Sequence, residues 1–288
     1  FNMASPAGLF TNIVTIPVVG FGVLPLGLVS LLMFSLFPGF SSACLVLAGK
    51  LAMPCIAFLA WVCELPGAWV RTVTPGLFYV VAWYLFMGGV YVWFRNEARK
   101  MGIFMLMAAV LIFLVHGAVD VRKRYFTQTL DITMLDVGQG SSSLIRLPGG
   151  ACFLVDGGGF SSNEVFDTGR YLVAPFLWRQ HILTLNGVVL THPDADHMNG
   201  LLFVLENFRV KELYKNADQV DNRVYERLME LTRSRGIGVH QVNPGGEILV
   251  PARDVTFRFL PGLNDIHENM TTSGSNVNNN ALVMSVRF

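Results

Sequence analysis

Residues 187–200, GVVLTHPDADHMNG, join a strand-like apolar run to a cluster of metal-binding side chains. The run Val188–Leu190 is β-branched and bounded by turn residues, which predicts a buried strand. Neutral imidazole nitrogen and carboxylate oxygen are ligands of zinc, manganese and iron. Because the chain is no longer extended beyond the strand, we expect the ligands to converge on one spot. The candidate metal ligands are His192, Asp194, Asp196 and His197.

The alternative for this stretch is a loop whose acidic residues only cap the helix that follows. Asp196 lies where an N-cap would be placed, so capping can also be partly true. A six-residue motif with a strand before it and a helix after it is hard to reach by accident, however. The pattern therefore favours metal binding.

The polarity of the chain is uneven along its 288 residues. A content of 52% hydrophobic and 14% charged residues does not suit a single soluble domain. Before Phe94 the only charged side chains are Lys50, Glu64 and Arg71, whereas the part after Asp120 has the polarity of a globular protein. We predict a membrane part at 1–119, a linker at 120–130 and a soluble part at 131–288.

Two stretches of the membrane part, Thr74–Phe94 and Met101–Val119, are long enough as helices to span a bilayer core of about 30 Å. The basic loop 95–100 between them is placed in the cytoplasm by the positive-inside rule, so the soluble part lies outside. The basic cluster 122–124 argues for the opposite orientation, but the loop weighs more because the soluble part is long. Upstream, prolines interrupt Leu9–Phe37, which predicts a kinked span or two broken helices.

The soluble part begins with strands and continues with alternating helices and strands. Strands are predicted from Asp131, at Ser142–Leu147 and at Ala151–Val155, joined by glycine turns. A helix at Glu164–Gln180 follows, then the motif strand and a helix at Met198–Phe208. This order predicts a sandwich with helices on its outer faces.

Several phrases of the sequence resemble a known family. The pattern His-x-Asp-x-Asp-His after a strand ending in Leu-Thr resembles the metal motif of the metallo-β-lactamase fold, and Asp194 in place of His is typical of its competence-protein branch. The phrases LDVGQG at 135–140 and VDGG at 155–158 are similar to that branch. TNIVTIPVVG at 11–20 resembles the ComEC competence membrane domain. The resemblance covers nearly the whole chain.

The resemblance implies a fold class: a multi-pass α-helical membrane domain followed by an α+β metallo-β-lactamase-like sandwich (αβ/βα), truncated before its last ligand motifs. It also implies a function, an inner-membrane channel for DNA uptake in natural transformation with a metal-dependent nuclease domain that degrades the non-transported strand. The expected partners are single-stranded DNA, other competence proteins, the lipid membrane and further copies of the chain.

The same resemblance assigns roles to the site residues. Two divalent metals, zinc or manganese, would bind to His192 with Asp194 and to Asp196 with His197, and Asp196 is also counted as catalytic. Asp156 corresponds to a carboxylate that orders the ligand loop by hydrogen bonds, and it too is counted among the catalytic residues. Asp136 is a weaker candidate, and Ser141 departs from the aspartate frequent in the family. The family's further ligands would follow residue 288, so we expect this chain by itself to be inactive.

Two alternatives stay open beside DNA uptake with a nuclease. One is a membrane-tethered metallohydrolase of another substrate, which Asp194 disfavours; the other is a channel with a non-catalytic metal domain. A net charge of +1 gives no electrostatic footprint for a polyanion. The local basic exceptions are 122–124, Arg209, Lys211 and Lys215. His181 and His240 are expected to be ordinary polar residues.

Overall fold

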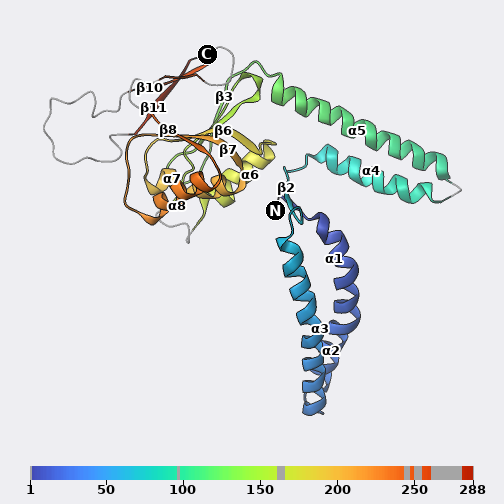
Figure 1. The fold of residues 1–288 in the computed structure, drawn as a ribbon. Coiled ribbons are helices and arrows are strands. Elements are labelled where there is room, and N and C mark those ends of the chain that lie inside the picture. The colour runs from blue at the N-terminus through green and yellow to red at the C-terminus, as the bar shows by residue number, and fades with distance from the viewer. Residues whose placement is uncertain are drawn as a thin grey trace. The chain divides into compact units, whose positions relative to one another are not determined.

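The chain divides into two compact units, Phe1–Thr72 and Val73–Phe288 (Figure 1). The computed structural model describes residues 2–95, 98–160, 166–242, 247–249, 255–260 and 281–287.

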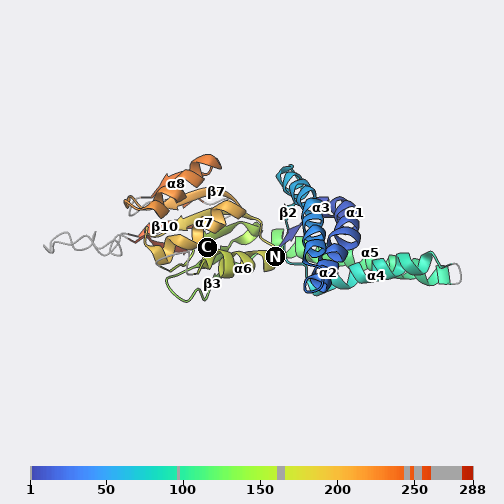
Figure 2. The same cartoon turned by 90° about the horizontal axis from the view of Figure 1, so that it is seen from below.

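The first unit is built from apolar helices. α1 (Pro6–Pro17), the π-helical turn η1 (Val18–Val23) and α2 (Leu24–Met33) follow one another without a break, and α3 (Pro38–Glu64) packs against them (Figure 2). Short strands β1 (Met3–Ala4) and β2 (Val70–Arg71) pair antiparallel. The predicted interruption of Leu9–Phe37 is thus a wide turn within one helix, and α2 carries Pro25 in its first turn, where proline is tolerated.

Two serines link α2 to α3 inside the first unit. Ser30 and Ser41 are buried, and their hydroxyl oxygens lie 2.9 Å apart. Each hydroxyl also donates to the carbonyl oxygen of the other residue, at 2.9 and 2.8 Å. Small hydroxyl residues let helix backbones approach closely and hydrogen-bond across a helix pair in an apolar environment.

The second unit opens with a pair of packed helices, α4 (Leu77–Trp93) and α5 (Arg99–Tyr125). Gly102 permits the close approach, since a Cβ there would lie 2.6 Å from the backbone nitrogen of Trp93. α4 begins three residues later than the predicted span because Pro75 and Gly76 precede it, and Gly76 is the N-cap. α5 continues to Tyr125, into the residues predicted as a linker.

Three helices of the described part are long and apolar enough to cross a membrane: Pro6–Met33, Pro38–Glu64 and Arg99–Tyr125. α4, with 17 residues, is shorter and extends about 25 Å. Large apolar side chains cover the outsides of these helices, for example Phe21 at 87% and Leu9 at 74% exposure. Such a surface needs lipid or further membrane helices against it.

A mixed sheet of six strands forms the centre of the remaining part of the second unit, in the order β3-β4-β5-β6-β7-β8. β3, β4 and β5 pair antiparallel, whereas β5 to β8 are parallel. The strands are β3 (Asp131–Met134), β4 (Ser143–Arg146), β5 (Cys152–Val155), β6 (Thr184–Leu190), β7 (Arg209–Lys215) and β8 (Gly238–Gln241). The 3-10 turn η3 (Pro148–Gly150) joins β4 to β5.

Each face of this sheet is covered (Figure 1). One face packs against the helices, with Leu154, Val188 and Leu201 in its core. The other packs against a smaller sheet, where the ring centroids of Phe153 and Phe257 lie 4.9 Å apart. The helices are the π turn η4 (Gly169–Val173), α6 (Ala174–Arg179), α7 (Ala195–Asn207) and α8 (Arg223–Ser234); the smaller sheet is β9 (Glu247–Leu249), β10 (Thr256–Leu260) and β11 (Val283–Arg287).

The soluble part has the predicted architecture, a sandwich with helices on its outer face, but several helices begin or end at other residues than predicted. Of the helix predicted at Glu164–Gln180, residues 164 and 165 lie outside the described residues, and the π turn η4 precedes Pro175. α7 begins at Ala195, three residues before the predicted start. Because β5 and β6 are parallel neighbours, the residues after their carboxyl ends, Asp156 and the motif, meet at one edge of the sheet.

Candidate metal centre

β6 delivers the motif from the fully buried centre of the sheet. Val188, Val189 and Leu190 have no exposed surface, because β6 lies between β5 and β7 and both faces of the sheet are covered. The chain then turns, and α7 begins at Ala195. The N-cap of α7 is Asp194 rather than the predicted Asp196, and its side chain makes no capping hydrogen bond. Asp196 lies in the first turn instead.

Asp156, directly after β5, is the hydrogen-bonding hub of the site. Its side chain is 1% exposed, and its backbone φ is +56°, in the left-handed region. Oδ1 accepts from the Thr191 backbone N–H at 2.9 Å, and Oδ2 accepts from the Thr191 hydroxyl at 2.7 Å. Oδ2 also accepts from the Ser141 hydroxyl at 3.1 Å and lies 2.8 Å from Nδ1 of His197. One carboxylate thus ties together the ends of two strands, a glycine loop and α7.

His197 has a fixed ring orientation. An ionised carboxylate has no proton to give, so Nδ1 of His197 donates to Asp156 and the neutral ring carries its lone pair on Nε2. Nε2 lies 3.9 Å from Oδ2 of Asp196. Hydrogen bonding of one ring nitrogen to a carboxylate is the usual support of a metal-binding histidine.

His192 reaches the same tautomer by another path. Its ring is 4% exposed, and Nδ1 lies 3.0 Å from the Thr191 hydroxyl oxygen. That hydroxyl gives its single proton to Asp156, so Nδ1 of His192 is the donor and Nε2 carries the lone pair. Nε2 lies 3.5 Å from Oδ2 of Asp194. The ring centroids of His192 and His197 are 4.0 Å apart.

The structure therefore brings the predicted ligands together as two histidine–carboxylate pairs, not around a single point. Over the described residues, no three His, Cys, Asp or Glu side chains form a group that could hold an ion. The donor set still fits a divalent metal, since both imidazoles present an Nε2 lone pair beside a carboxylate.

Glycine in the first loop is required for the approach of α7. Gly140 has a φ of +76°, and a Cβ there would overlap the backbone carbonyl of Asp196. The loop 138–140 therefore lies directly against the first turn of the motif helix. The side chain of Asp136 accepts a hydrogen bond from the Gly138 N–H at 3.4 Å. This contact suits its predicted role in fixing the turn.

Two residues, Ser141 and Thr191, make more hydrogen bonds within the site than the sequence indicated. Ser141 was expected to lose importance because it departs from the family pattern, yet its hydroxyl hydrogen-bonds Asp156 and lies 3.2 Å from Nδ1 of His197. Thr191 was not singled out, although it contacts both Asp156 and His192. Its position between a buried strand and the first predicted ligand, His192, was the available signal.

The pKa of His197 lies above the ordinary imidazole value. Burial of the ring lowers this pKa, but the hydrogen bond to Asp156 and the charges of Asp156, Asp196 and Asp194 raise it by more. A metal would bind only the neutral ring, so it would have to displace the proton that this raised pKa retains. Metal binding at His197 would therefore compete with protonation.

We expect metal affinity to fall as the pH decreases through the raised pKa of His197, by up to about tenfold per pH unit below it. Titration of the metal-free protein with Mn²⁺ or Zn²⁺ over a pH series measures the midpoint. An affinity that stays constant down to the ordinary imidazole value of about 6.5 would contradict this assignment.

Comparison with known proteins gives separate matches for the apolar helices and for the mixed-sheet part. Residues 1–97 match the Competence protein family, and residues 135–265 match the Metallo-beta-lactamase superfamily. ComE operon protein 3 from Bacillus subtilis (strain 168) is 28% identical over 140 residues, which cover 45% of this chain and 18% of that protein. Together these similarities support a protein of the ComEC competence type.

The matches confirm the resemblance and the fold class predicted from the sequence: apolar membrane helices precede a mixed-sheet domain of the metallo-β-lactamase superfamily. Members of that superfamily bind divalent metal, and the competence match together with the apolar helices marks a membrane protein. A metallo-β-lactamase crystal structure from Hirschia baltica aligns at 16% identity and a TM-score of 0.21, covering 46% of this chain and 56% of that one. The chain spans about a fifth of the length of its Bacillus relative.

Proposed function

We propose that this chain is part of an inner-membrane protein for DNA uptake, whose metal domain hydrolyses phosphodiester bonds of the strand that is not transported. The observation that carries the proposal is the site at the end of β6, in a chain that also contains competence-type membrane helices. The basic loop 95–100 supports an orientation with the metal domain outside the cytoplasm.

In this proposal some residues of the site hold metal and others position the metal-binding side chains. His192 with Asp194 would hold one divalent ion, and Asp196 with His197 a second. Bound there, divalent ions such as zinc or manganese supply Lewis-acid activation of water and of the phosphodiester. Asp156 fixes His197, and Thr191 fixes His192, each with Nδ1 protonated and Nε2 directed to the neighbouring carboxylate.

One observation favours a second candidate, a channel whose metal domain is not catalytic. Within the part of the chain that the structure describes, the predicted ligands form two histidine–carboxylate pairs, and no three of them form a group that could hold one ion. A site with few ligands binds metal weakly. The two candidates differ in whether nuclease activity accompanies metal binding.

The test is removal and restoration of metal in the full-length protein. We expect a chelator to abolish degradation of single-stranded DNA and Mn²⁺ or Zn²⁺ to restore it, with metal content rising in parallel. Metal that returns without any nuclease activity would support the non-catalytic candidate. Activity that persists in metal-free protein would refute a metal-dependent nuclease.

A further inference from the structure

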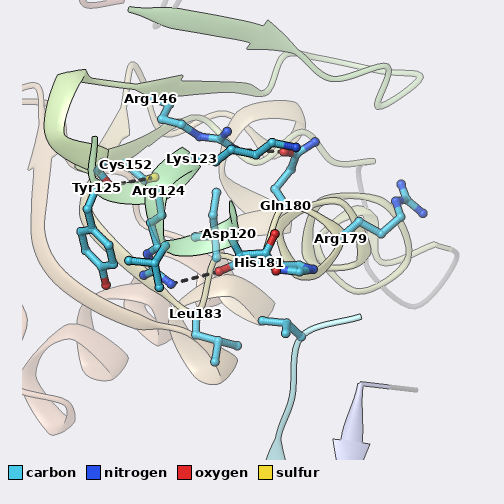
Figure 3. Close-up of a pocket in the computed structure, with 14 residues that line it drawn as sticks. Asp120, Lys123, Arg124, Tyr125, Arg146, Cys152, Arg179, Gln180, His181 and Leu183 are labelled. Carbon is cyan, nitrogen blue, oxygen red and sulfur yellow. Dashed lines mark hydrogen bonds and ion pairs between the residues drawn. The ribbon is translucent and has the colours of Figure 1, made fainter. Parts of the chain in front are cut away.

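A cavity of about 550 Å³ lies at the carboxyl end of α5 (Figure 3). Its wall comes from the last turns of α5, from the β4–β5 region and from the segment after α6. In Figure 3, Lys123 and Arg146 extend toward Gln180, while Arg124, Asp120 and His181 lie below them. The cavity is separate from the metal-binding motif, none of whose residues lines it.

Positive charge dominates the cavity wall. Asp120 is the one carboxylate among the lining residues. Four basic side chains line the cavity: Lys123, Arg124, Arg146 and Arg179. Asp120 is already engaged, since it accepts from the Tyr79 hydroxyl at 2.7 Å and lies 3.4 Å from Nδ1 of His181. The net charge of the wall therefore suits an anion.

The guanidinium groups of Arg124 and Arg146 are each held by a hydrogen bond and keep further N–H donors for a ligand. Arg124 donates one N–H to the backbone carbonyl of His181 at 3.2 Å, and Arg146 donates one to Oε1 of Gln180 at 2.9 Å. A guanidinium has five N–H donors in a planar fork that matches phosphate oxygens. Lys123 and Arg179 are exposed and form no ion pair with any residue that the structure describes.

An apolar groove runs along the α4–α5 pair toward this cavity. The groove has a volume of about 290 Å³, and Tyr79, Trp83 and Phe113 are among its lining residues. Tyr79 joins the two sites, because its ring lines the groove and its hydroxyl binds Asp120 of the cavity. Phe113 and Asp120 are seven positions apart, about two helical turns, and so lie on one face of α5.

The position of the cavity on α5 suits the surface of a membrane. α5 is long and apolar enough to cross a membrane, and the cavity is at its end. Tyr125 and Phe126 follow with 54% and 70% exposure, as in an aromatic belt at a membrane interface.

We propose that this cavity binds the phosphodiester headgroup of an anionic phospholipid, with an acyl chain of that lipid in the α4–α5 groove. Basic cavities at the end of membrane helices attract anionic headgroups. Inorganic phosphate or a nucleic acid would satisfy the charges but would leave the adjoining apolar groove unused. The combination of cavity and groove therefore fits an amphipathic anion.

The test uses the full-length protein in mixed micelles that contain phosphatidylglycerol or phosphatidylcholine with brominated acyl chains. Bromine quenches tryptophan fluorescence, and Trp83 lines the groove. We expect stronger quenching with phosphatidylglycerol, and Trp83→Phe should remove this difference. The double variant Lys123→Gln with Arg179→Gln should weaken phosphatidylglycerol binding about 25-fold, at about fivefold for each charge lost.

Matched variants separate charge loss from damage to the fold. Arg122→Gln removes an adjacent exposed charge that does not line the cavity and should bind like the wild type. Lys123→Arg keeps the charge and should also bind normally. Equal quenching by the two lipids would overturn the proposal. So would displacement of the lipid by inorganic phosphate, or by a single-stranded oligonucleotide, at concentrations comparable with those of the lipid.

Discussion

Replacement of His192 and Asp196 together by alanine is expected to reduce the nuclease activity of the full-length protein by about 10³-fold or more. The double variant removes one predicted ligand from each histidine–carboxylate pair. The distance from the histidine Nε2 to the carboxylate Oδ2 is 3.5 Å in the pair of His192 and 3.9 Å in the pair of His197. Metal bound at such a site contributes several kcal/mol of transition-state stabilisation, so its loss has an effect of this size. Exonuclease rate, metal content and transformation frequency are measured on the same preparations.

The control is another histidine–carboxylate pair of the same domain. His240→Ala with Glu212→Ala removes a pair joined at 2.7 Å between β7 and β8, where both side chains are partly exposed to solvent. This control should keep nuclease activity and metal. If the site variant also keeps its nuclease activity, the motif is not the catalytic centre. If uptake persists after nuclease activity is lost, the membrane part carries transport without strand degradation.

Asp156→Asn is expected to lower metal affinity by about 10–100-fold, although Asp156 is not proposed to touch the metal. The amide has one acceptor oxygen where the carboxylate has two, so it cannot serve Thr191, Ser141 and His197 together. Each buried partner left unpaired also costs about 1–3 kcal/mol of stability. Metal titration and thermal unfolding of the metal-free protein measure the two effects.

Asp136→Asn provides the comparison, because Asp136 is an exposed carboxylate two residues after the end of β3, in the same sheet. Its one contact given by the structure is the 3.4 Å bond to the Gly138 N–H, so little change in affinity or stability is expected. Equal effects of the two substitutions would show that Asp156 is no hub. Loss of stability without loss of metal affinity would reduce Asp156 to a structural residue.

Local patterns in the sequence predicted the elements that carry strong signals. Glycine and proline punctuate the strands β4 and β5, and the β-branched run before His192 identified the buried strand β6. The five candidate site residues could be named because they fall in two short phrases at the ends of neighbouring parallel strands. Their roles as ligands and as a supporting carboxylate remain predictions.

Features that depend on contacts between distant residues were not predictable in this way. Ser141 and Thr191 meet Asp156 across 15 and 35 positions of sequence, and no local pattern encodes such contacts. No span was predicted over 38–64, yet α3 continues through Lys50 and Pro54 as one helix. β9, with three residues, is too short for a periodic signal.

The π turn η1 determines which side chains of the span Pro6–Met33 lie on the same side of the helix. Thr11 in α1 and Ser30 in α2, both buried, are nineteen positions apart, which in an uninterrupted α-helix would rotate them about 100° from each other. A wide turn accommodates one extra residue, and the remaining eighteen positions make about five whole turns. The glycine- and proline-rich phrase thus acts as a one-residue insertion that restores helical phase, so that the two hydroxyl-bearing side chains share one edge of the span.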